Sequence, residues 1–317
     1  MYSFLLLVSF AAIIVTVSCQ GSCPPPEYLK PCVCRSDVTP VTVACVGLTG
    51  HEALERVFRK SRDYPIHSLI LESSTMMYIP ASIFTANHQV IFIKIVNCTM
   101  ASVFDERPPV TSDDIGLFTI HDSTFQRGLD WELFRNFTWD EIIIENTEVK
   151  RIGPAFNNYM NPDTRGIILN NTKTHSLSDK AFSKLTDLDR FICTKGSITT
   201  LKRSMFPSPT KLYLLDMSEQ NIETLPDDMF TNMPSLETVN FDKNQFQRLP
   251  STVWKDVWKT IVEVGVDDNP LVCDCKIKWF ITARSVRLYG TCAQPSNVRG
   301  TDLLDLKESN FKYCEKQ

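Results

Sequence analysis

The sequence predicts an α/β repeat solenoid in which short parallel strands line one side. Three observations support this fold class. An apolar pattern recurs along residues 66–271 at steps of 24 or 25 residues. In every unit, two fixed inward positions are separated by one residue, as the period of two in a strand requires. Cysteines cluster before the first unit and after the last one. Because one such unit cannot bury its own apolar face, the units must stack on one another.

Residues 236–250, LETVNFDKNQFQRLP, form the clearest unit. Its apolar residues and one asparagine are Leu236, Val239, Phe241, Asn244, Phe246 and Leu249. This spacing resembles one unit of a leucine-rich repeat. The resemblance implies that positions four and six of each unit point inward. It also implies that an asparagine at position nine turns the chain and can bond the backbone of the next coil. We therefore expect a leucine-rich-repeat horseshoe with a parallel concave sheet and disulfide-bonded N- and C-terminal caps.

About nine units fit one frame. They begin at Ile66, Val90, Ile115, Trp139, Thr164, Leu188, Leu212, Leu236 and Ile261. Position nine departs from the family, since asparagine occurs there only at Asn244 and Asn269 and the other residues are mostly small or polar. An aromatic residue recurs late in the unit, at Phe84, Phe134, Phe156, Phe182, Phe206, Phe230 and Trp254. The second unit has Pro108 and Pro109 at this place, and Asn157–Pro162 of the fourth unit predicts a loop.

The chain divides into four segments. Residues 1–19 predict a signal peptide that is cleaved after Cys19, because Phe4–Val17 is apolar and uncharged. An uncleaved membrane anchor is the alternative, although the apolar run is short for a bilayer. Residues 20–65 predict an N-terminal cap with a short helix over 51–60, residues 66–271 the repeats, and residues 272–317 a C-terminal cap. No later segment predicts membrane insertion, so we expect a secreted, extracellular protein.

Four cysteines precede the repeats and four follow them. They are Cys23, Cys32, Cys34 and Cys45, then Cys273, Cys275, Cys292 and Cys314. A cap is needed because the end coils would otherwise expose an apolar end and a strand edge. Each group of four allows three pairings, and a zinc site is the alternative to two disulfides.

The N-terminal cap combines P-C-x-C at residues 31–34, V-x-C at 43–45 and L-x-x-V-F at 54–58. This combination resembles a group of secreted arthropod leucine-rich-repeat proteins. The group includes the non-catalytic subunit of oplophorus-luciferin 2-monooxygenase. Related caps imply the disulfides Cys23–Cys34, Cys32–Cys45, Cys273–Cys292 and Cys275–Cys314. They also imply a cap helix over 276–284 that covers the last coil with Trp279 and Phe280.

Two cysteines remain outside the caps. Cys98 occupies position nine of the second unit and Cys193 position six of the sixth. Four coils separate them, which is roughly 19 Å at the spacing of strands. Since a disulfide needs Cα atoms within about 7 Å, we expect two buried free thiols. A reactive cysteine is the alternative.

No motif in the sequence predicts an enzyme, a cofactor or a metal site. The net charge of −4 argues against a nucleic-acid surface. The sequence contains no G-x-S-x-G, H-E-x-x-H, P-loop or G-x-G-x-x-G pattern. The five histidines do not form a helical pair, and we interpret them as isolated surface residues.

The concave face predicts a site for a protein partner. In this frame, positions two, three, five, seven and eight face that side. The candidate residues are Phe92, Leu117, Ile143, Ile168, Arg190, Ile192 and Leu214. Adjacent apolar residues of this kind mark interaction sites. Packing between neighbouring strands is the alternative explanation. The C-terminal part of the face is acidic, which either attracts a basic partner or serves solubility.

Three N-x-S/T sequons predict N-glycosylation, at Asn97, Asn136 and Asn170. Asn136 lies on a convex segment and is the first candidate. A glycan on Asn170 would crowd the candidate concave site. Taken together, the sequence predicts a non-catalytic accessory or stabilising subunit that binds an extracellular protein partner. The alternative is a recognition or matrix protein that binds a receptor, a glycan or a microbial surface. The oligomeric state and the identity of the partner are left open.

Overall fold

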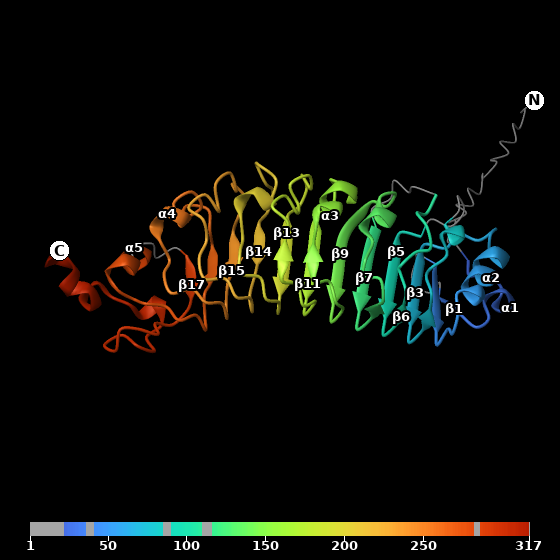
Figure 1. Cartoon of the computed structure of the whole chain (residues 1–317), viewed down its shortest axis with the longest axis horizontal. Coiled ribbons are helices and arrows are strands. Elements are labelled where there is room, and N and C mark those ends of the chain that lie inside the picture. The colour runs from blue at the N-terminus through green and yellow to red at the C-terminus, as the bar shows by residue number, and fades with distance from the viewer. Residues whose placement is uncertain (1–21, 36–40, 85–89, 110–115, 282–285, 317) are drawn as a thin grey trace, which may run out of the picture.

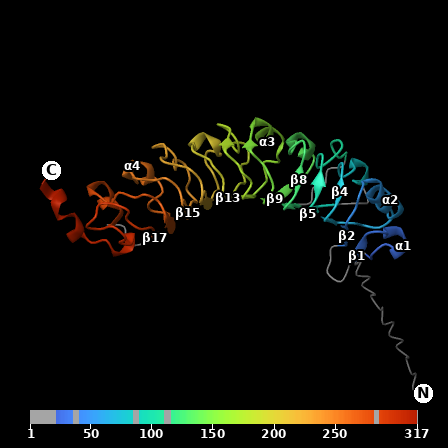
Figure 2. The same cartoon turned by 60° about the horizontal axis from the view of Figure 1, so that its bottom comes forward.

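The structure is a computed structural model that describes residues 22–35, 41–84, 90–109, 116–281 and 286–316. The expected signal peptide over residues 1–19 and the start of the third unit at Ile115 lie outside these residues. The described coils form one elongated stack from the N-terminal to the C-terminal end (Figure 1). Figure 2 shows that the stack is an open arc, with the strands along its inner side and helices along its outer side.

The described residues form a 12-stranded sheet in the order β1-β2-β3-β5-β7-β9-β11-β13-β14-β15-β16-β17, a 3-stranded sheet β4-β6-β8 and a pair β10-β12. The strands are β1 (Val33–Arg35), β2 (Thr42–Val46), β3 (Ser68–Glu72), β4 (Thr75–Met76), β5 (Phe92–Val96), β6 (Thr99–Met100), β7 (Gly116–His121), β8 (Thr124–Phe125), β9 (Trp139–Glu145), β10 (Arg151–Ile152), β11 (Gly166–Asn170), β12 (Ser176–Leu177), β13 (Arg190–Thr194), β14 (Leu214–Asp216), β15 (Thr238–Asn240), β16 (Glu263–Gly265) and β17 (Arg287–Tyr289). All neighbours in the large sheet are parallel except β1 and β2.

Short helices connect the strands on the outer side. The α-helices are α1 (Pro26–Leu29), α2 (Glu52–Lys60), α3 (Pro154–Tyr159), α4 (Ser251–Trp254) and α5 (Lys278–Ile281). The 3-10 helices are η1 (Ala81–Ile83), η2 (Trp131–Phe134), η3 (Arg203–Met205), η4 (Cys275–Ile277), η5 (Leu303–Asp305) and η6 (Glu308–Lys316). In the described part of the chain, none of these helices has both the length and the apolar character needed to cross a bilayer.

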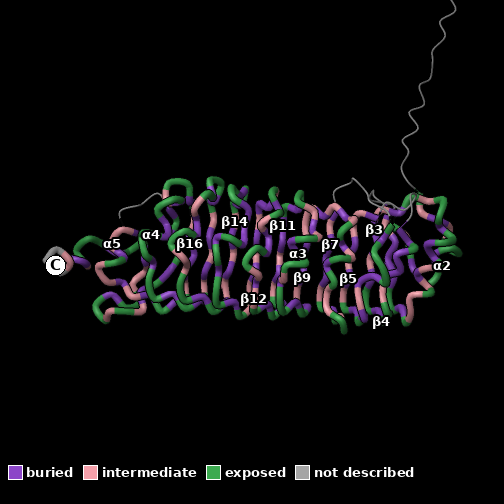
Figure 3. Tube along the Cα trace, turned by 45° about the horizontal axis from the view of Figure 1, so that its top comes forward, coloured by how far each residue is buried: buried purple, intermediate pink, exposed green. Residues whose placement is uncertain are grey.

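The core follows the predicted frame in every unit. Each side chain at position four is 0% exposed, and each side chain at position six is 0 or 1% exposed. Buried segments therefore recur in coil after coil along the whole stack (Figure 3). The register agrees, because equivalent positions of neighbouring units are paired, as Ile167 is with Phe191. The predicted leucine-rich-repeat solenoid is confirmed.

The side chain at position nine bonds the coil before it, not the coil after it as we expected. Asn244 Nδ2 donates to Met217 O at 2.8 Å, and Asn244 Oδ1 accepts from Ile222 N at 3.0 Å. Both partners belong to the preceding unit. A serine at this position makes one of the two equivalent hydrogen bonds, since Ser123 Oγ accepts from Cys98 N of the preceding unit at 3.0 Å. Position nine thus satisfies backbone groups that the turn would otherwise leave buried and unpaired.

The late aromatic residues form a spine of ring contacts in two parts, one from Phe84 to Phe206 and one from Phe230 to Trp254, with one correction. Phe104, and neither Pro108 nor Pro109, fills the place in the second unit. Its ring lies 5.6 Å from Phe84 and 5.5 Å from Phe134, edge to face in both cases. Phe104 lies four positions before Pro108, and its backbone forms an isolated parallel bridge with Ile79 of the first unit.

Asn157–Pro162 was expected to be a loop, but its first three residues belong to α3. The helix begins at Pro154, which is tolerated at this first helical position because its missing N–H has no intrahelical partner. Asn157 is buried, and its Oδ1 accepts from Lys184 N at 2.9 Å in the next coil. This tertiary hydrogen bond accounts for the asparagine inside a helix.

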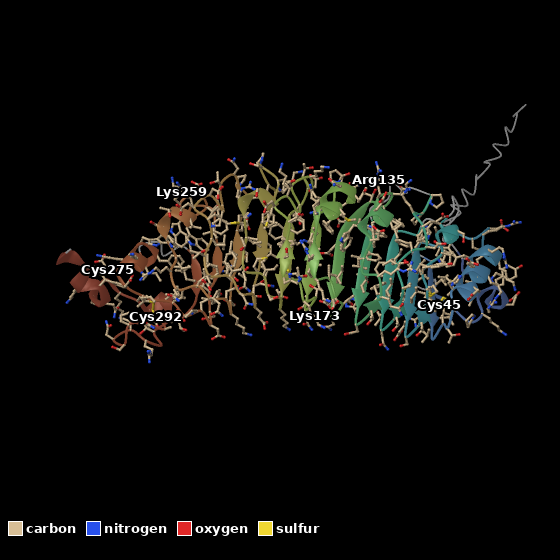
Figure 4. All side chains as sticks on the ribbon, in the orientation of Figure 1. Cys45, Arg135, Lys173, Lys259, Cys275 and Cys292 are labelled. Carbon is tan, nitrogen blue, oxygen red and sulfur yellow. A yellow bond between two sulfur atoms is a disulfide. The ribbon has the colours of Figure 1, made fainter. Side chains whose placement is uncertain are left out.

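Both ends of the stack carry disulfides, and Figure 4 labels Cys45 at one end and Cys275 and Cys292 at the other. The structure joins Cys23 to Cys34, Cys32 to Cys45, Cys273 to Cys292 and Cys275 to Cys314. Two cap strands were not predicted. β1 pairs antiparallel with β2, and β17 extends the parallel sheet beyond the ninth unit.

Candidate interaction surface

Three rows of side chains run across the inner face of the sheet, one residue from each strand. We call them row three, row five and row seven after the position in the unit. Row five reads Ile70, Lys94, Thr119, Ile143, Ile168, Ile192, Asp216, Asn240, Gly265 and Tyr289. Most of these side chains are half-buried, because the arc opens them to solvent while their neighbours partly cover them. The rows differ greatly along the stack, whereas the core positions do not.

Row five contains an isoleucine ladder, which we define as Ile143, Ile168 and Ile192. These residues are directly paired across β9, β11 and β13. All three side chains are half-buried. At the spacing of strands, the ladder spans about 10 Å. It is the longest run of apolar side chains in this row, and Thr119 and Asp216 bound it.

The other candidate residues lie in row three, which is interrupted. Phe92 and Leu117 are paired across β5 and β7. Glu141, Gly166 and Arg190 then separate them from Leu214. The seven candidates therefore share one face, but they form an apolar pair, a ladder, one cation and one leucine in place of a single apolar patch.

Arg190 is held in place by a charged network that the sequence analysis missed. Its Nη1 lies 3.2 Å from Glu141 Oε1, and its Nε lies 3.2 Å from Asp189 Oδ1. Arg165 also donates to Asp189 Oδ2, at 2.7 Å from Nη2. Gly166 leaves room for the bridge, since a Cβ there would lie 2.8 Å from Glu141 Oε1. The sequence does contain a signal for this bridge, because Glu141 and Arg190 have opposite charges and occupy the same position two units apart.

This network governs the ionisation of Arg190. Burial lowers the pKa of its guanidinium, but the negative charges of Glu141 and Asp189 outweigh burial and raise that pKa above its ordinary value. The cation is thus neutralised within the protein before any partner arrives. The Arg190 guanidinium therefore offers a partner a hydrogen-bond donor in a fixed position, and its positive charge is already balanced.

The C-terminal part of the face is acidic. We define the acidic end as Asp216, Glu219, Glu237, Asp242, Glu263, Asp267 and Asp268. Asp216 Oδ1 accepts from Ser218 N at 2.9 Å, and Asn240 Oδ1 accepts from Asp242 N at 2.9 Å. These side-chain bonds take the N–H groups that would continue the ladder, so β14 and β15 have only three residues.

Two carboxyl groups of the acidic end titrate abnormally. Burial raises the pKa of Asp242, and repulsion by Asp267, Asp216 and Asp268 adds to this, although a hydrogen bond from Asp267 N opposes it. Burial also raises the pKa of Asp267, with repulsion by Asp302 and Asp268. The carboxylates around Asp242 and Asp267 therefore repel one another in the folded protein.

The three sequon asparagines differ in accessibility. Asn97 is exposed, and its Nδ2 donates to Ser73 Oγ at 3.2 Å. Asn136, our first candidate, is half-buried and donates to Pro108 O at 2.7 Å. Asn170 lies in row seven beside the isoleucine ladder, and its Oδ1 accepts from Thr194 Oγ1 at 3.0 Å. Accessibility thus favours Asn97 over Asn136 as the glycan acceptor.

Neither free thiol shows the environment of a reactive cysteine. Cys98 and Cys193 are both buried. Burial raises the pKa of Cys98 and raises that of Cys193 to about 12. A thiolate, the reactive form, is thus strongly disfavoured at neutral pH. Over the described ranges, no three His, Cys, Asp or Glu side chains gather closely enough to hold a metal ion.

Comparisons with known proteins agree with this fold. Residues 129–257 match the family model described as BspA type leucine rich repeat region, in 6 copies. Trophoblast glycoprotein of Mus musculus is 28% identical over 137 residues, which are 40% of this chain and 32% of that protein. Chondroadherin of Homo sapiens is 26% identical over 107 residues, which are 33% of this chain and 28% of that protein.

The chain thus spans less than a third of the length of these relatives. Among solved structures, a chain of the octameric complex of latrophilin 3, Unc5D and FLRT2 aligns with 74% of this chain and 88% of its own length, at 16% identity and a TM-score of 0.45. These matches do not include a secreted arthropod protein, so the resemblance to that group stays a prediction. The chain therefore has a leucine-rich-repeat fold, and over part of its length it is similar to trophoblast glycoprotein and chondroadherin.

Proposed function

We propose that this protein is a secreted leucine-rich-repeat protein that binds a protein partner through the inner face of its sheet. The observation that carries the proposal is the isoleucine ladder on β9, β11 and β13. The three side chains are half-buried, and Figure 2 shows no described ribbon that crosses the inner side of the arc. Adjacent apolar side chains on a soluble protein favour an interaction site.

Folding alone does not require these isoleucines. Row five holds Lys94, Thr119, Asp216, Asn240 and Gly265 in other units, all within the same parallel sheet. Each of these strands forms without an apolar residue at that position. β-propensity and packing between strands therefore leave three consecutive isoleucines unexplained, whereas contact with a partner explains them.

The finer form of the proposal is a non-catalytic accessory or stabilising subunit. Its support is the resemblance of the N-terminal cap to the secreted arthropod group. The four cap disulfides support an oxidising, extracellular compartment.

A recognition or matrix protein is the second candidate. In this role the same face would bind a receptor, a glycan or a microbial surface. The relationship to trophoblast glycoprotein and chondroadherin favours it, since both are extracellular leucine-rich-repeat proteins. The two candidates differ in whether the protein is recovered within a complex of fixed composition.

Purification of the native protein from secreted fluid, with mild crosslinking and mass spectrometry, distinguishes these candidates. A single stoichiometric protein, crosslinked to Lys94 or Lys195, would support the accessory subunit. Recovery of a free protein that adheres to cells or matrix would support the recognition protein instead.

A pair of substitutions in row five tests the surface itself. We expect Ile168→Asp to abolish partner binding and to leave secretion and the melting temperature nearly unchanged, because the side chain faces the open side of the sheet. Ile70→Asp on β3 is the matched control, since it is the same change in the same row outside the ladder. Equal loss of binding in both variants would contradict the proposed surface.

A further inference from the structure

The inner face changes chemistry abruptly between β13 and β14. Ile192, the last residue of the isoleucine ladder, is paired with Asp216, the first carboxylate of the acidic end. In row seven, Asp242 follows on the next coil, and Asp267 N donates to Asp242 Oδ1 at 2.7 Å on the coil after that. The isoleucine ladder of row five is therefore followed by Asp216 in the same row and by Asp242 and Asp267 in row seven of the next two coils.

Basic residues of the protein leave much of the acidic end uncompensated. Lys243 lies 3.8 Å from Glu219, and Arg287 lies 3.3 Å from Glu263. Within the described part of the chain, no Lys or Arg nitrogen lies within 4.0 Å of the other five carboxylates, Asp216, Glu237, Asp242, Asp267 and Asp268. Arg190, the other cation of row three, is already paired with Glu141 and Asp189.

Repulsion among these carboxylates destabilises the protein when no partner is bound. It is visible in the raised pKa values of Asp242 and Asp267, where neighbouring carboxylates add to the effect of burial. A cationic group placed between them would relieve this repulsion and would be attracted by the uncompensated charge. The isoleucine ladder requires the same partner to present apolar side chains one or two coils away.

We propose that the sheet face of β9–β16 docks a basic amphipathic segment of a protein partner. Its apolar side chains lie on the isoleucine ladder, and its lysine or arginine side chains lie on the acidic end. This inference rests on the proposed function and adds the chemistry and the direction of the partner along the sheet. A partner with an acidic or purely apolar contact surface does not fit this face.

The test uses the full protein and synthetic peptides of equal length that carry a fluorophore. One peptide joins a leucine-rich half to a lysine-rich half, a second joins a leucine-rich half to a glutamine-rich half, and a third joins a glycine-rich half to a lysine-rich half. Fluorescence anisotropy measures their dissociation constants at low and at high salt. We expect the lysine–leucine peptide to bind about tenfold or more tightly than either of the others, and to weaken as salt rises.

Two double variants locate the charge that matters. Asp242→Asn with Asp267→Asn removes two charges from the acidic end and keeps both acceptor oxygens. We expect it to weaken the lysine–leucine peptide about tenfold and to reduce the salt dependence. Asp227→Asn with Asp256→Asn is the matched control outside the sheet, because both are exposed carboxylates that accept a threonine hydroxyl. It should change the affinity less than twofold, and the melting temperature of each variant verifies its fold.

Three results would overturn the inference. Equal losses in the two double variants would mean that only net charge attracts the peptide. Equal affinity for the glutamine–leucine peptide would mean that the acidic end plays no part. Binding of calcium chloride alone that the Asp242/Asp267 variant loses would make the acidic end a cation site. The proposed function survives each of these results if Ile168→Asp still abolishes binding of the native partner, and it fails separately if that variant binds normally.

Discussion

Replacing Asn244 by alanine tests the stacking of the coils directly. The side chain is 1% exposed and lies between two units. Its Nδ2 reaches Met217 O at 2.8 Å, Phe241 O at 3.1 Å and Asp242 O at 3.2 Å, and its Oδ1 accepts from Ile222 N at 3.0 Å. Alanine would leave the Met217 carbonyl and the Ile222 amide of the preceding coil buried and unpaired.

The expected cost follows from those two groups. A buried backbone group that loses its partner costs about 1–3 kcal/mol, so two of them cost about 2–6 kcal/mol. Phe241 O and Asp242 O share the remaining donor and add little. We therefore expect Asn244→Ala to lower the free energy of unfolding by about 4 kcal/mol, which is large for a single substitution.

Urea denaturation followed by circular dichroism, with the disulfides intact, measures this loss. Because repeat arrays can open locally, hydrogen exchange at the Ile222 amide should be measured as well. Asn221→Ala is the matched control, since Asn221 is exposed, and it should cost less than about 0.5 kcal/mol. Asn244→Gln should recover part of the loss, because Gln220 makes both bonds one unit earlier, to Cys193 O and from Ile198 N. A cost for alanine below about 1 kcal/mol would refute the reasoning.

Three further predictions concern the cap, the acidic end and the thiols. Cys275→Ser opens a loop closed over a separation of 39 residues, and we expect a loss of about 2–5 kcal/mol and poor secretion. Unchanged yield and melting temperature would contradict this. Asp242→Asn should stabilise the protein at neutral pH, because a raised pKa means that the carboxylate contributes stability below its unfolded pKa and loses it as pH rises through the folded one. The gain in melting temperature should vanish in acid. Cys98 and Cys193 should react with a thiol reagent only after denaturant is added.

The fold could be predicted because its core signal repeats. Positions four and six are independent tests of one frame in every unit, so a single irregular unit does not obscure it. The cap strand β17 was missed for the opposite reason. It has three residues and is not followed by a complete unit. Val286 and Leu288 are the buried apolar residues that could have indicated it. Phe104 was missed because it lies four positions before the place at which the frame expects the ring.

The surface was less predictable than the core. The isoleucine ladder follows from the frame, since equivalent positions must be neighbours in a parallel stack. The bridge from Glu141 to Arg190 does not, because it spans two units and depends on the missing side chain of Gly166. The uncompensated charge of the acidic end also needed coordinates, since a lysine such as Lys243 could have paired with any of several carboxylates.

At position eight the repeat array fixes the backbone conformation although the residue type differs between units. All nine residues at this position are non-glycine and left-handed, with φ from 49° to 55°, namely Ser73, Asn97, Asp122, Asn146, Asn171, Lys195, Glu219, Lys243 and Asp268. Each costs of order 1–2 kcal/mol that glycine would avoid. Side-chain bonds along the edge offset part of this, as from Asn146 Nδ2 to Asp122 Oδ1 and from Asn171 Nδ2 to Asn146 Oδ1 at 2.9 Å each.

This regularity separates the rows that build the solenoid from those available for function. Positions four and six are buried in every unit, and position eight is left-handed in every unit. Rows three and five instead change chemistry along the stack, from Phe92 and Leu117 through the isoleucine ladder to Asp216. A sheet whose stability came from these rows would be expected to repeat them, because each strand faces the same packing problem. Their variation along the arc therefore supports the proposal that the inner face binds a partner.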